Sequence, residues 1–444
     1  MMTVKRAIEI YNELADVISR RNSAGLYTAM GYSSNLDILL DFDVDTLNEL
    51  LGRYVPDGVL EDMRPAALIS SHRELLETIV YYCSNGIGGE ADISDPDLIR
   101  NSFPCKNGMG GTAVQAALAL ERLGAQSVVH LSDDSEEVRS QLDYPCIRVP
   151  LSADTLGGAM DVRQRNPQEV HVILQFQKGG VIRLGSGEVT IPVSNRLILT
   201  KNTVNVTLPL DENYLGWIEK HAECVSSNVL SSFNCILDPD VLRERLERVK
   251  SHVDAYRAAN PDGIVYFEDA HYHDRTVRRL CIETLYPHVD IMSMNEEELK
   301  YTLDMFGKPV DIDDILSCVE GVDYLRKTCG IRKGVIVHTK DYAMYSGDRT
   351  GLDIERGMVY GALLATAKAA FGSYGSDEQI RSILDGELSG RGISAMETAS
   401  SHGLDERVCV VPTFYLDKPK YTIGLGDSFT GGVQLCFNSC LHHK

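Results

Sequence analysis

Apolar positions recur along this chain mostly at helical spacing, interrupted by short continuous apolar runs. Residues about 4–20 place apolar side chains among charged ones in the pattern of an amphipathic helix. The segment "GTAVQAALALERLGAQSVVHLS" predicts a helix that stops at Gly124 and is followed by a strand. The same order returns with a helix at about 240–258, a strand in "GIVYFEDA", a helix at about 273–285 and a strand in "HVDIMSMN".

The C-terminal third continues this order. "KGVIVHTKDYAMYSG" predicts two strands joined by a turn, and residues 361–372 and 427–437 predict helices. Strands that alternate with helices over this length are typical of an α/β domain of three αβα layers. The sequence therefore predicts a mainly parallel central sheet covered by helices on both faces.

The pattern changes between about residues 145 and 210. "HVILQFQKGGVIRLGSG", "VTIPV" and "NRLILTKN" predict short antiparallel strands with glycine turns, which we expect in a smaller β-rich lid. We expect residues 1–444 to form one unit. Its large domain would comprise approximately 1–34, 108–144 and 211–444, and its discontinuous lid approximately 35–107 and 145–210.

Charge and composition narrow the classes of function. The formal net charge of −21 over 444 residues argues against a nucleic-acid or membrane-surface binder, which normally has a basic face. The eleven cysteines include no C-x-x-C pair, which indicates reduced thiols and no zinc site. The first residues lack the apolar core of a signal peptide, and no apolar run approaches 18 residues. We therefore expect a cytoplasmic protein.

The segment "YTIGLGDSFTGGVQLCF", residues 421–437, carries the first candidate chemistry. Gly424 and Gly426 permit a tight turn, and a helix is expected to begin at Ser428. Free N–H groups at a helix start attract an anion, and the helix dipole adds to the attraction. Asp427 could accept a proton from a substrate hydroxyl while the N–H groups hold a transferring phosphate. By itself, the segment also fits a simple turn with Asp427 as helix N-cap.

Three other segments contain candidate site residues. In "MSMNEEELKY", Asn295 and Glu298 have the spacing of a capping box, and Glu298 could also face a hydrated Mg²⁺, which needs only one or two carboxylates. In "NGMGGTAVQAALAL", Gly110 and Gly111 allow a ligand to approach the backbone or simply make a compact helix start. In "SSNLDILL", Asn35 and Asp37 could bind sugar hydroxyls or form an Asx turn.

Together these segments resemble the ADP-dependent sugar kinases (glucokinase and phosphofructokinase), a branch of the ribokinase-like superfamily. The order along most of the chain is "NLD", "GIGGEAD", "GMGGTA", "HVILQFQKG", "VYFEDA", "MNEEEL", "VIVHTKDYAMY" and "VVPTFYLDKPKYTIGLGDSFTGG". The last two segments, "VIVHTKDYAMY" and "VVPTFYLDKPKYTIGLGDSFTGG", are the most specific to the family. The resemblance implies a ribokinase-like fold and a magnesium-dependent enzyme of carbohydrate metabolism that acts in glycolysis. Its reaction would transfer the terminal phosphoryl group of ADP to a sugar hydroxyl, giving AMP.

The resemblance also implies roles for individual residues. Asp427 would be the catalytic base, and the anion hole would be formed by the amides of Gly424, Leu425, Gly426 and Asp427. The metal would be held through Glu298, with Glu268 as a second residue and Asn295 in support. The sugar would be contacted by Asn35, Asp37, Glu90, Gly110, Gly111 and Gln175. The nucleotide would lie near His338, Val410, Val411, Pro412 and Ile423.

Two departures from the family pattern matter, the first for the role of Glu268 and the second for the acceptor. The family often has H-x-E on a central strand, where this chain has Tyr266-Phe267-Glu268. Many members have R-x-G-G, where this chain has Gly108 in place of the arginine. Glu90 favours a free hydroxyl, so we expect glucose or another hexose ahead of fructose 6-phosphate, with ribose 1-phosphate and nucleosides open. A phosphate site on the lid could use Lys106, Lys178, Arg183, Arg196 and Lys201.

Two other functions remain open at this point. One is an ATP-dependent ribokinase-like kinase of a carbohydrate, a nucleoside or ribose 1-phosphate. The other is a non-catalytic sugar or nucleotide sensor, although a sensor would need no base such as Asp427. A dinucleotide-dependent dehydrogenase is disfavoured because no G-x-G-x-x-G follows the first strand. We expect no nucleic-acid or membrane partner, and either a monomer or a homodimer.

Overall fold

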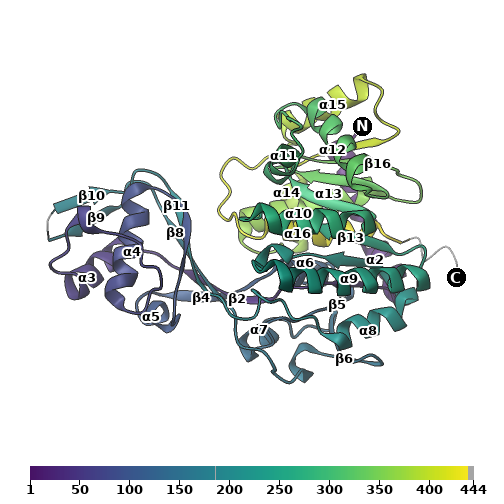
Figure 1. The fold of residues 1–444 in the computed structure, drawn as a ribbon. Helices are drawn as coiled ribbons and strands as arrows, with labels where there is room; N and C mark the ends of the chain where they lie inside the picture. Colours follow the sequence, from purple (N-terminus) through teal and green to yellow (C-terminus); the bar gives the residue numbers. More distant parts are fainter. Residues whose placement is uncertain (186, 439–444) are drawn as a thin grey trace.

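The computed structural model describes residues 1–185 and 187–438, which form a large α/β domain and a smaller domain beside it (Figure 1). The large domain contains a ten-stranded sheet. In order across the sheet its strands are β17 (Val408–Pro412), β16 (Tyr342–Gly347), β15 (Gly334–His338), β14 (Ile291–Asn295), β13 (Ile264–Glu268), β12 (Val225–Leu230), β1 (Tyr27–Met30), β5 (Ser127–Val129), β6 (Ile147–Ser152) and β7 (Thr155–Gly157). The run from β15 to β6 is parallel, and β16, β17 and β7 are antiparallel to their neighbours.

Two groups of helices pack on this sheet. One group consists of α1 (Val4–Asn12), α2 (Leu14–Ser23), α6 (Thr112–Arg122), α13 (Ile354–Phe371), α14 (Asp377–Leu384) and α16 (Leu425–Val433). The other consists of α8 (Glu212–Lys220), α9 (Pro239–Ala259), α10 (Arg275–Thr284), α11 (Glu296–Met305), α12 (Ile315–Cys329) and α15 (Gly390–Ser401). The expected αβα architecture with a mainly parallel central sheet is confirmed.

The smaller domain is built on a five-stranded sheet. Its order is β3 (Gly89–Asp92), β11 (Asn195–Lys201), β8 (Val170–Phe176), β2 (Asn35–Leu40) and β4 (Cys105–Gly110). The hairpin β9 (Val181–Leu184) and β10 (Gly187–Thr190) and the helices α3 (Val44–Tyr54), α4 (His72–Asn85) and α5 (Asp97–Arg100) complete it, and α7 (Glu136–Gln141) lies near its base (Figure 1). Short 3₁₀ turns lie at Leu60–Asp62, Ala159–Asp161, Ala222–Cys224, Phe233–Cys235, Tyr286–His288 and Gln434–Cys436.

One expected boundary of the lid is wrong. Residues 145–169 were assigned to the lid with the β-rich segment that follows them. In the structure β6 pairs in parallel with β5, and β7 pairs with β6, so both strands extend the large sheet. Strand propensity alone cannot distinguish the two sheets, because the choice of sheet depends on long-range pairing.

Two helices differ in extent from their sequence pattern. The amphipathic segment 4–20 forms two helices that meet at Glu13, whose N–H group is shared between the carbonyls of Glu9 and Ile10. Helix α13 begins at Ile354, before the expected 361, and is buried along most of its length. A helix that is apolar all round has no amphipathic stripe to mark its beginning.

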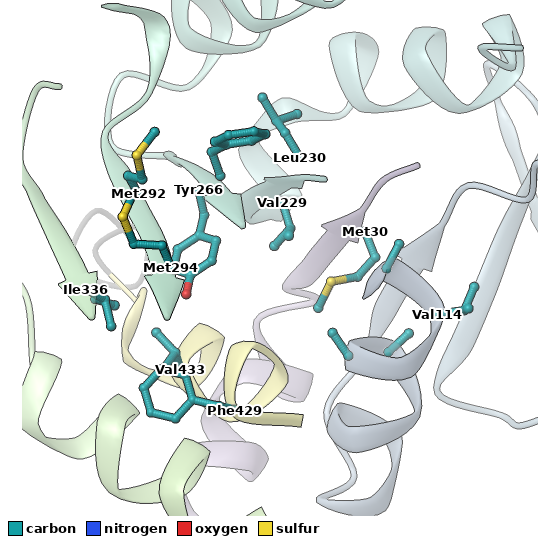
Figure 2. Close-up of a cluster of buried hydrophobic side chains, with 14 of the residues drawn as sticks. Met30, Val114, Val229, Leu230, Tyr266, Met292, Met294, Ile336, Phe429 and Val433 are labelled. Carbon is teal, nitrogen blue, oxygen red and sulfur yellow. The ribbon is translucent and has the colours of Figure 1, made fainter. Parts of the chain in front are cut away.

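The core lies between the central strands and the helices α6 and α16. Figure 2 shows Phe429 and Val433 of α16 together with Tyr266, Met294 and Ile336 of the strands. All five side chains are buried. This packing fixes the position of α16, whose first turn contains Asp427. Among the described residues, no helix combines the length and apolar character that crossing a membrane requires.

Candidate active site

The helix that carries Asp427 begins earlier than its sequence indicates. Helix α16 starts at Leu425, not at Ser428, because Gly424 adopts the left-handed conformation with φ of +67° and turns the chain directly into the helix. The first intrahelical bond runs from the N–H of Ser428 to the carbonyl of Gly424, at 3.1 Å. Asp427 therefore lies in the first turn and is not the N-cap. The amides of Leu425, Gly426 and Asp427 have no acceptor within the helix, as an anion hole requires.

Two cavities meet at this helix start. One, of about 640 Å³, is lined by Leu425, Gly426 and Phe429. The other, of about 910 Å³, lies toward the lid and is lined by Ile423, among others. Residues on the two sides of Gly424 therefore face different cavities. An anion bound at the helix start would be within reach of both.

The smaller of the two cavities, lined from β15, β16, α13 and α16, contains only one of the residues expected at the nucleotide. His338 lines it, as expected. Val410, Val411 and Pro412 are buried in β17, where they pair with β16, and Ile423 lines the lid-side cavity. The wall is provided by the residues that follow β17, namely Thr413, Phe414, Tyr415, Leu416, Asp417 and Pro419. The apolar run 410–412 instead pairs with β16 at the edge of the large sheet and packs into the core.

A hydrogen-bonded network lies behind Gly426. Nε2 of His338 lies 3.0 Å from Oε1 of Glu268, and Thr430 donates to Oε2 of Glu268 at 2.6 Å. Tyr266, which stands in place of the family histidine, donates to the same Oε2 at 3.4 Å. Burial opposes the charged imidazolium, but the hydrogen bond and the charge of Glu268 raise the pKa of His338. The network therefore holds the His338 imidazole beside the helix start, next to a carboxylate that favours its charged form.

Asn295 and Glu298 form the expected capping box. Oδ1 of Asn295 accepts from the N–H of Glu298 at 2.9 Å, and Oε2 of Glu298 accepts from the N–H of Asn295 at 2.8 Å. Burial first, and then the negative charge of Asp269, raises the pKa of Glu298 to about 8. Within residues 1–185 and 187–438 no cluster of three or more His, Cys, Asp or Glu has the arrangement of a metal site. Glu298 therefore lies near the acids Asp269 and Glu268 without forming such a cluster with them.

Asp37, one of the candidate sugar-binding residues at the start of β2, lines the lid-side cavity, and Asn35 lies beside it. Nδ2 of Asn35 donates to Oδ1 of Asp37 at 2.7 Å and lies 3.2 Å from Nδ1 of His171. Burial raises the pKa of Asp37 to about 6, against the opposing charge of His171. A Cβ on Gly110 would overlap both Asn35 and Asp37, so only glycine permits this arrangement. The structure brings Asn35, Asp37 and Gly110 together.

The pairing of strands in the five-stranded sheet shows which other expected sugar residues share the face that carries Asp37. Leu39 pairs with Lys106 and Ile173, and Ile173 is joined through Ile198 to Glu90. Paired residues point to the same face. Gln175, two residues beyond Ile173, shares this face and lines the cavity. Glu90 and Lys106 therefore lie on the same face of the sheet as Asp37 and Gln175.

Sequence reasoning missed three residues of this site. His171 precedes Gln175 by four positions on β8, so strand alternation in "HVILQ" is a signal that could have identified it. Gln115 and Lys368 come from α6 and α13 and line the lid-side cavity. No local pattern distinguishes those two from ordinary helix residues.

Asp427 itself is half-buried at the meeting point of these groups. Burial raises the pKa of its carboxyl, and the charge of Lys368 and a hydrogen bond from Thr112 oppose this shift. A carboxylate with a raised pKa is a better proton acceptor than an ordinary surface aspartate. The arrangement suits removal of a proton from a hydroxyl group in the lid-side cavity.

Comparison with known proteins places this geometry in one family. The family described as "ADP-specific Phosphofructokinase/Glucokinase conserved region" matches residues 27–434. The ADP-specific phosphofructokinase of Pyrococcus furiosus is 23% identical, over 96% of this chain and 99% of that protein. The ADP-dependent glucose/glucosamine kinase of the same organism is 24% identical, over 91% and 92%.

A solved structure shows the same fold. It is that of the last common ancestor of ADP-dependent phosphofructokinases from Methanosarcinales, with a TM-score of 0.79 and 19% identity, and the match covers 99% of each chain. The family match extends over most of the chain and includes both domains and the start of α16. The chain therefore belongs to the ADP-specific phosphofructokinase/glucokinase family of phosphotransferases that act on alcohol groups.

Proposed function

We propose that this protein is an ADP-dependent sugar kinase that phosphorylates a hydroxyl group of a sugar or sugar phosphate and releases AMP. The observation that carries the proposal is the start of α16. Asp427 and three amides without an acceptor in the helix lie in its first turn, with Ile423 lining one cavity and Leu425 and Gly426 lining the other. The curated relatives, which are named as ADP-specific phosphofructokinases and ADP-dependent glucose/glucosamine kinases, supply the donor and the class of acceptor.

Catalysis would consist of one in-line displacement. The acceptor hydroxyl, held by Asn35, Asp37 and His171, gives its proton to Asp427 while its oxygen attacks the β-phosphorus of ADP. The bond from that phosphorus to the bridging oxygen breaks, and AMP leaves with the bonding electrons. The amides of Leu425 and Gly426 stabilise the charge on the moving group. Positioning and electrostatics are sufficient for such a transfer.

Of the two acids expected at the metal, Glu298 fits a divalent cation better than Glu268 does. Mg²⁺, when bound, would neutralise charge on the phosphate oxygens. Glu298 suits it because its carboxyl is buried among acids, a setting in which a nearby cation favours the ionised form. Glu268 suits it less, because both its oxygens accept hydrogen bonds, from His338 on one side and Thr430 on the other. We assign Glu268 to orienting His338 and Asn295 to holding Glu298.

A matrix of donors and acceptors tests the proposal. ADP, ATP and other nucleotides would be combined with glucose, fructose 6-phosphate, ribose 1-phosphate and nucleosides, with AMP and phosphorylated product measured by chromatography. We expect AMP to form from ADP with a hexose or hexose phosphate. Turnover with ATP alone would instead indicate an ATP-dependent ribokinase-like enzyme. Ligand binding by calorimetry without product from any pair would indicate a sensor.

A further inference from the structure

Lys368 is a cation at the centre of the site to which no role has been given. It lies in the last turn of α13, a helix that packs along α16, and it lines the lid-side cavity together with Asp37 and Ile423. Its side chain is half-buried. A lysine is costly to remove from water, and burial lowers its pKa here against the charges of Asp427 and Asp37. These acids are therefore within electrostatic range of the ammonium group.

Two neighbours hold the ammonium group in place. Nζ donates to Oε1 of Gln115, and it lies 3.3 Å from the hydroxyl of Tyr374 and 4.6 Å from the centre of its ring. The hydroxyl of Tyr374 in turn donates to the carbonyl of Gln115 at 3.1 Å. An ammonium group has three donors, and these two contacts use two of them. The third remains for a group in the cavity.

The same glutamine ties Lys368 to the anion hole. The Gln115 side chain packs so closely on Gly424 that a Cβ there would overlap it. Gly424 is the residue at which the chain passes from the lid-side cavity to the other one. Lys368 is therefore fixed on the acceptor side of the helix start, whereas His338 is on the opposite, nucleotide side.

We propose that Lys368 is a further catalytic residue, whose ammonium group donates a hydrogen bond to the phosphoryl group as it passes to the acceptor. This inference rests on the proposed kinase function. In the transfer, the acceptor oxygen forms its bond to phosphorus, the bond to the AMP oxygen breaks, and the hydroxyl proton goes to Asp427. Lys368 keeps its own protons and supplies charge. The contact between Lys368 and the phosphoryl group becomes strongest as that group reaches the acceptor. The helix-start amides then contact the phosphoryl group from the other side.

Steady-state kinetics of Lys368→Met test the proposal. We expect kcat to fall by about 10²–10³-fold, the loss typical of removing one such stabilising donor, and KM for ADP and for the sugar to stay within about threefold, since ground-state binding is preserved. Lys368→Arg, which keeps the charge, should recover part of kcat. Lys327→Met is the matched control, because Lys327 is exposed and also lies in the last turn of its helix.

Several outcomes separate this inference from the proposed function. An active parent whose Lys368→Met variant keeps kcat within threefold would overturn the role of Lys368 alone. A loss confined to the sugar KM would also overturn it, because Lys368 would then be an acceptor-binding residue. An inactive parent with every donor would overturn both. If Lys368→Met does not fold, as judged by circular dichroism, Lys368→Gln keeps the polar contacts without the charge and is expected to show the same loss of kcat.

Discussion

Oε1 of Gln115 occupies the space that a Cβ atom on Gly424 would need. Gly424 also has a φ of +67°, in the region that favours glycine. The turn before Asp427 is therefore determined twice, by the backbone conformation and by a contact with α6. Either constraint alone would select glycine, and together they fix where α16 begins.

Gly424→Ala should consequently impair both stability and activity. Gly403 provides a matched control, because its φ is also +67° but a Cβ there would meet nothing within 4 Å. We expect Gly403→Ala to cost about 1–2 kcal/mol, the strain of a left-handed alanine. Gly424→Ala should cost more and should reduce kcat, since the overlap displaces the helix start. Urea unfolding and initial rates would measure both, and equal costs with unchanged rates would contradict the argument.

Asp427→Asn should abolish transfer without unfolding the protein. The amide keeps the size of the side chain but cannot take the proton, so we expect kcat to fall by about 10²–10⁴-fold. Asp240→Asn is the control, because Asp240 also lies in the first turn of a helix and is exposed. Its kcat should match that of the parent. Turnover of Asp427→Asn within tenfold of the parent would rule out Asp427 as the base.

The ionised carboxylate of Asp37 should bind the sugar better but lower the free energy of unfolding, so both effects should depend on pH. Its pKa is raised to about 6, so the folded protein holds the proton more tightly than the unfolded chain does. Ionisation of Asp37 therefore lowers the free energy of unfolding as the pH rises. This loss is absent below about pH 4 and complete above about pH 6. Asp37→Asn cannot ionise and should raise the free energy of unfolding by about 3 kcal/mol at pH 7.5 and little at pH 4.

The same substitution should weaken the sugar contact. Asparagine offers a weaker acceptor than a carboxylate, so the KM for the sugar should rise at pH 7.5. Urea titrations at the two pH values and sugar-saturation curves would measure both effects. A change in stability that is equal at pH 4 and pH 7.5 would show that the carboxyl of Asp37 is not the group responsible.

Glu298→Gln and Glu298→Ala should separate the capping role from the metal role. Glutamine can still accept from the N–H of Asn295, so Glu298→Gln should fold. Because it removes a carboxyl whose pKa is raised to about 8, it should be at least as stable as the parent near pH 7.5. It should nevertheless need more Mg²⁺ for half-maximal activity, because it lacks the charge. Glu298→Ala should lose both, at a cost of about 1 kcal/mol in stability. Activity measured against Mg²⁺ after treatment with a chelator gives the comparison, and identical Mg²⁺ curves for parent and glutamine variant would refute the metal role.

Short sequence patterns predicted the structure correctly where interactions within one helical turn are sufficient to form it. The Asn295–Glu298 box follows from hydrogen bonds within one turn, and it is present as expected. The start of α16 was misplaced by three residues, because the left-handed Gly424 depends on its contact with α6. Val410 and Val411 were assigned to the nucleotide, yet an apolar strand reads the same whether it lines a cavity or pairs inside a sheet.

By itself, the sequence determined the α/β architecture and the family, because these depend on periodicity and on short motifs whose partners are close in the chain. Tertiary structure alone decided that β6 and β7 belong to the large sheet and that His171 lies beside Asp37. It also placed Lys368 beside Gln115, a contact between residues 253 positions apart. Such a contact depends on the packing of whole helices and strands, which no short segment of sequence records.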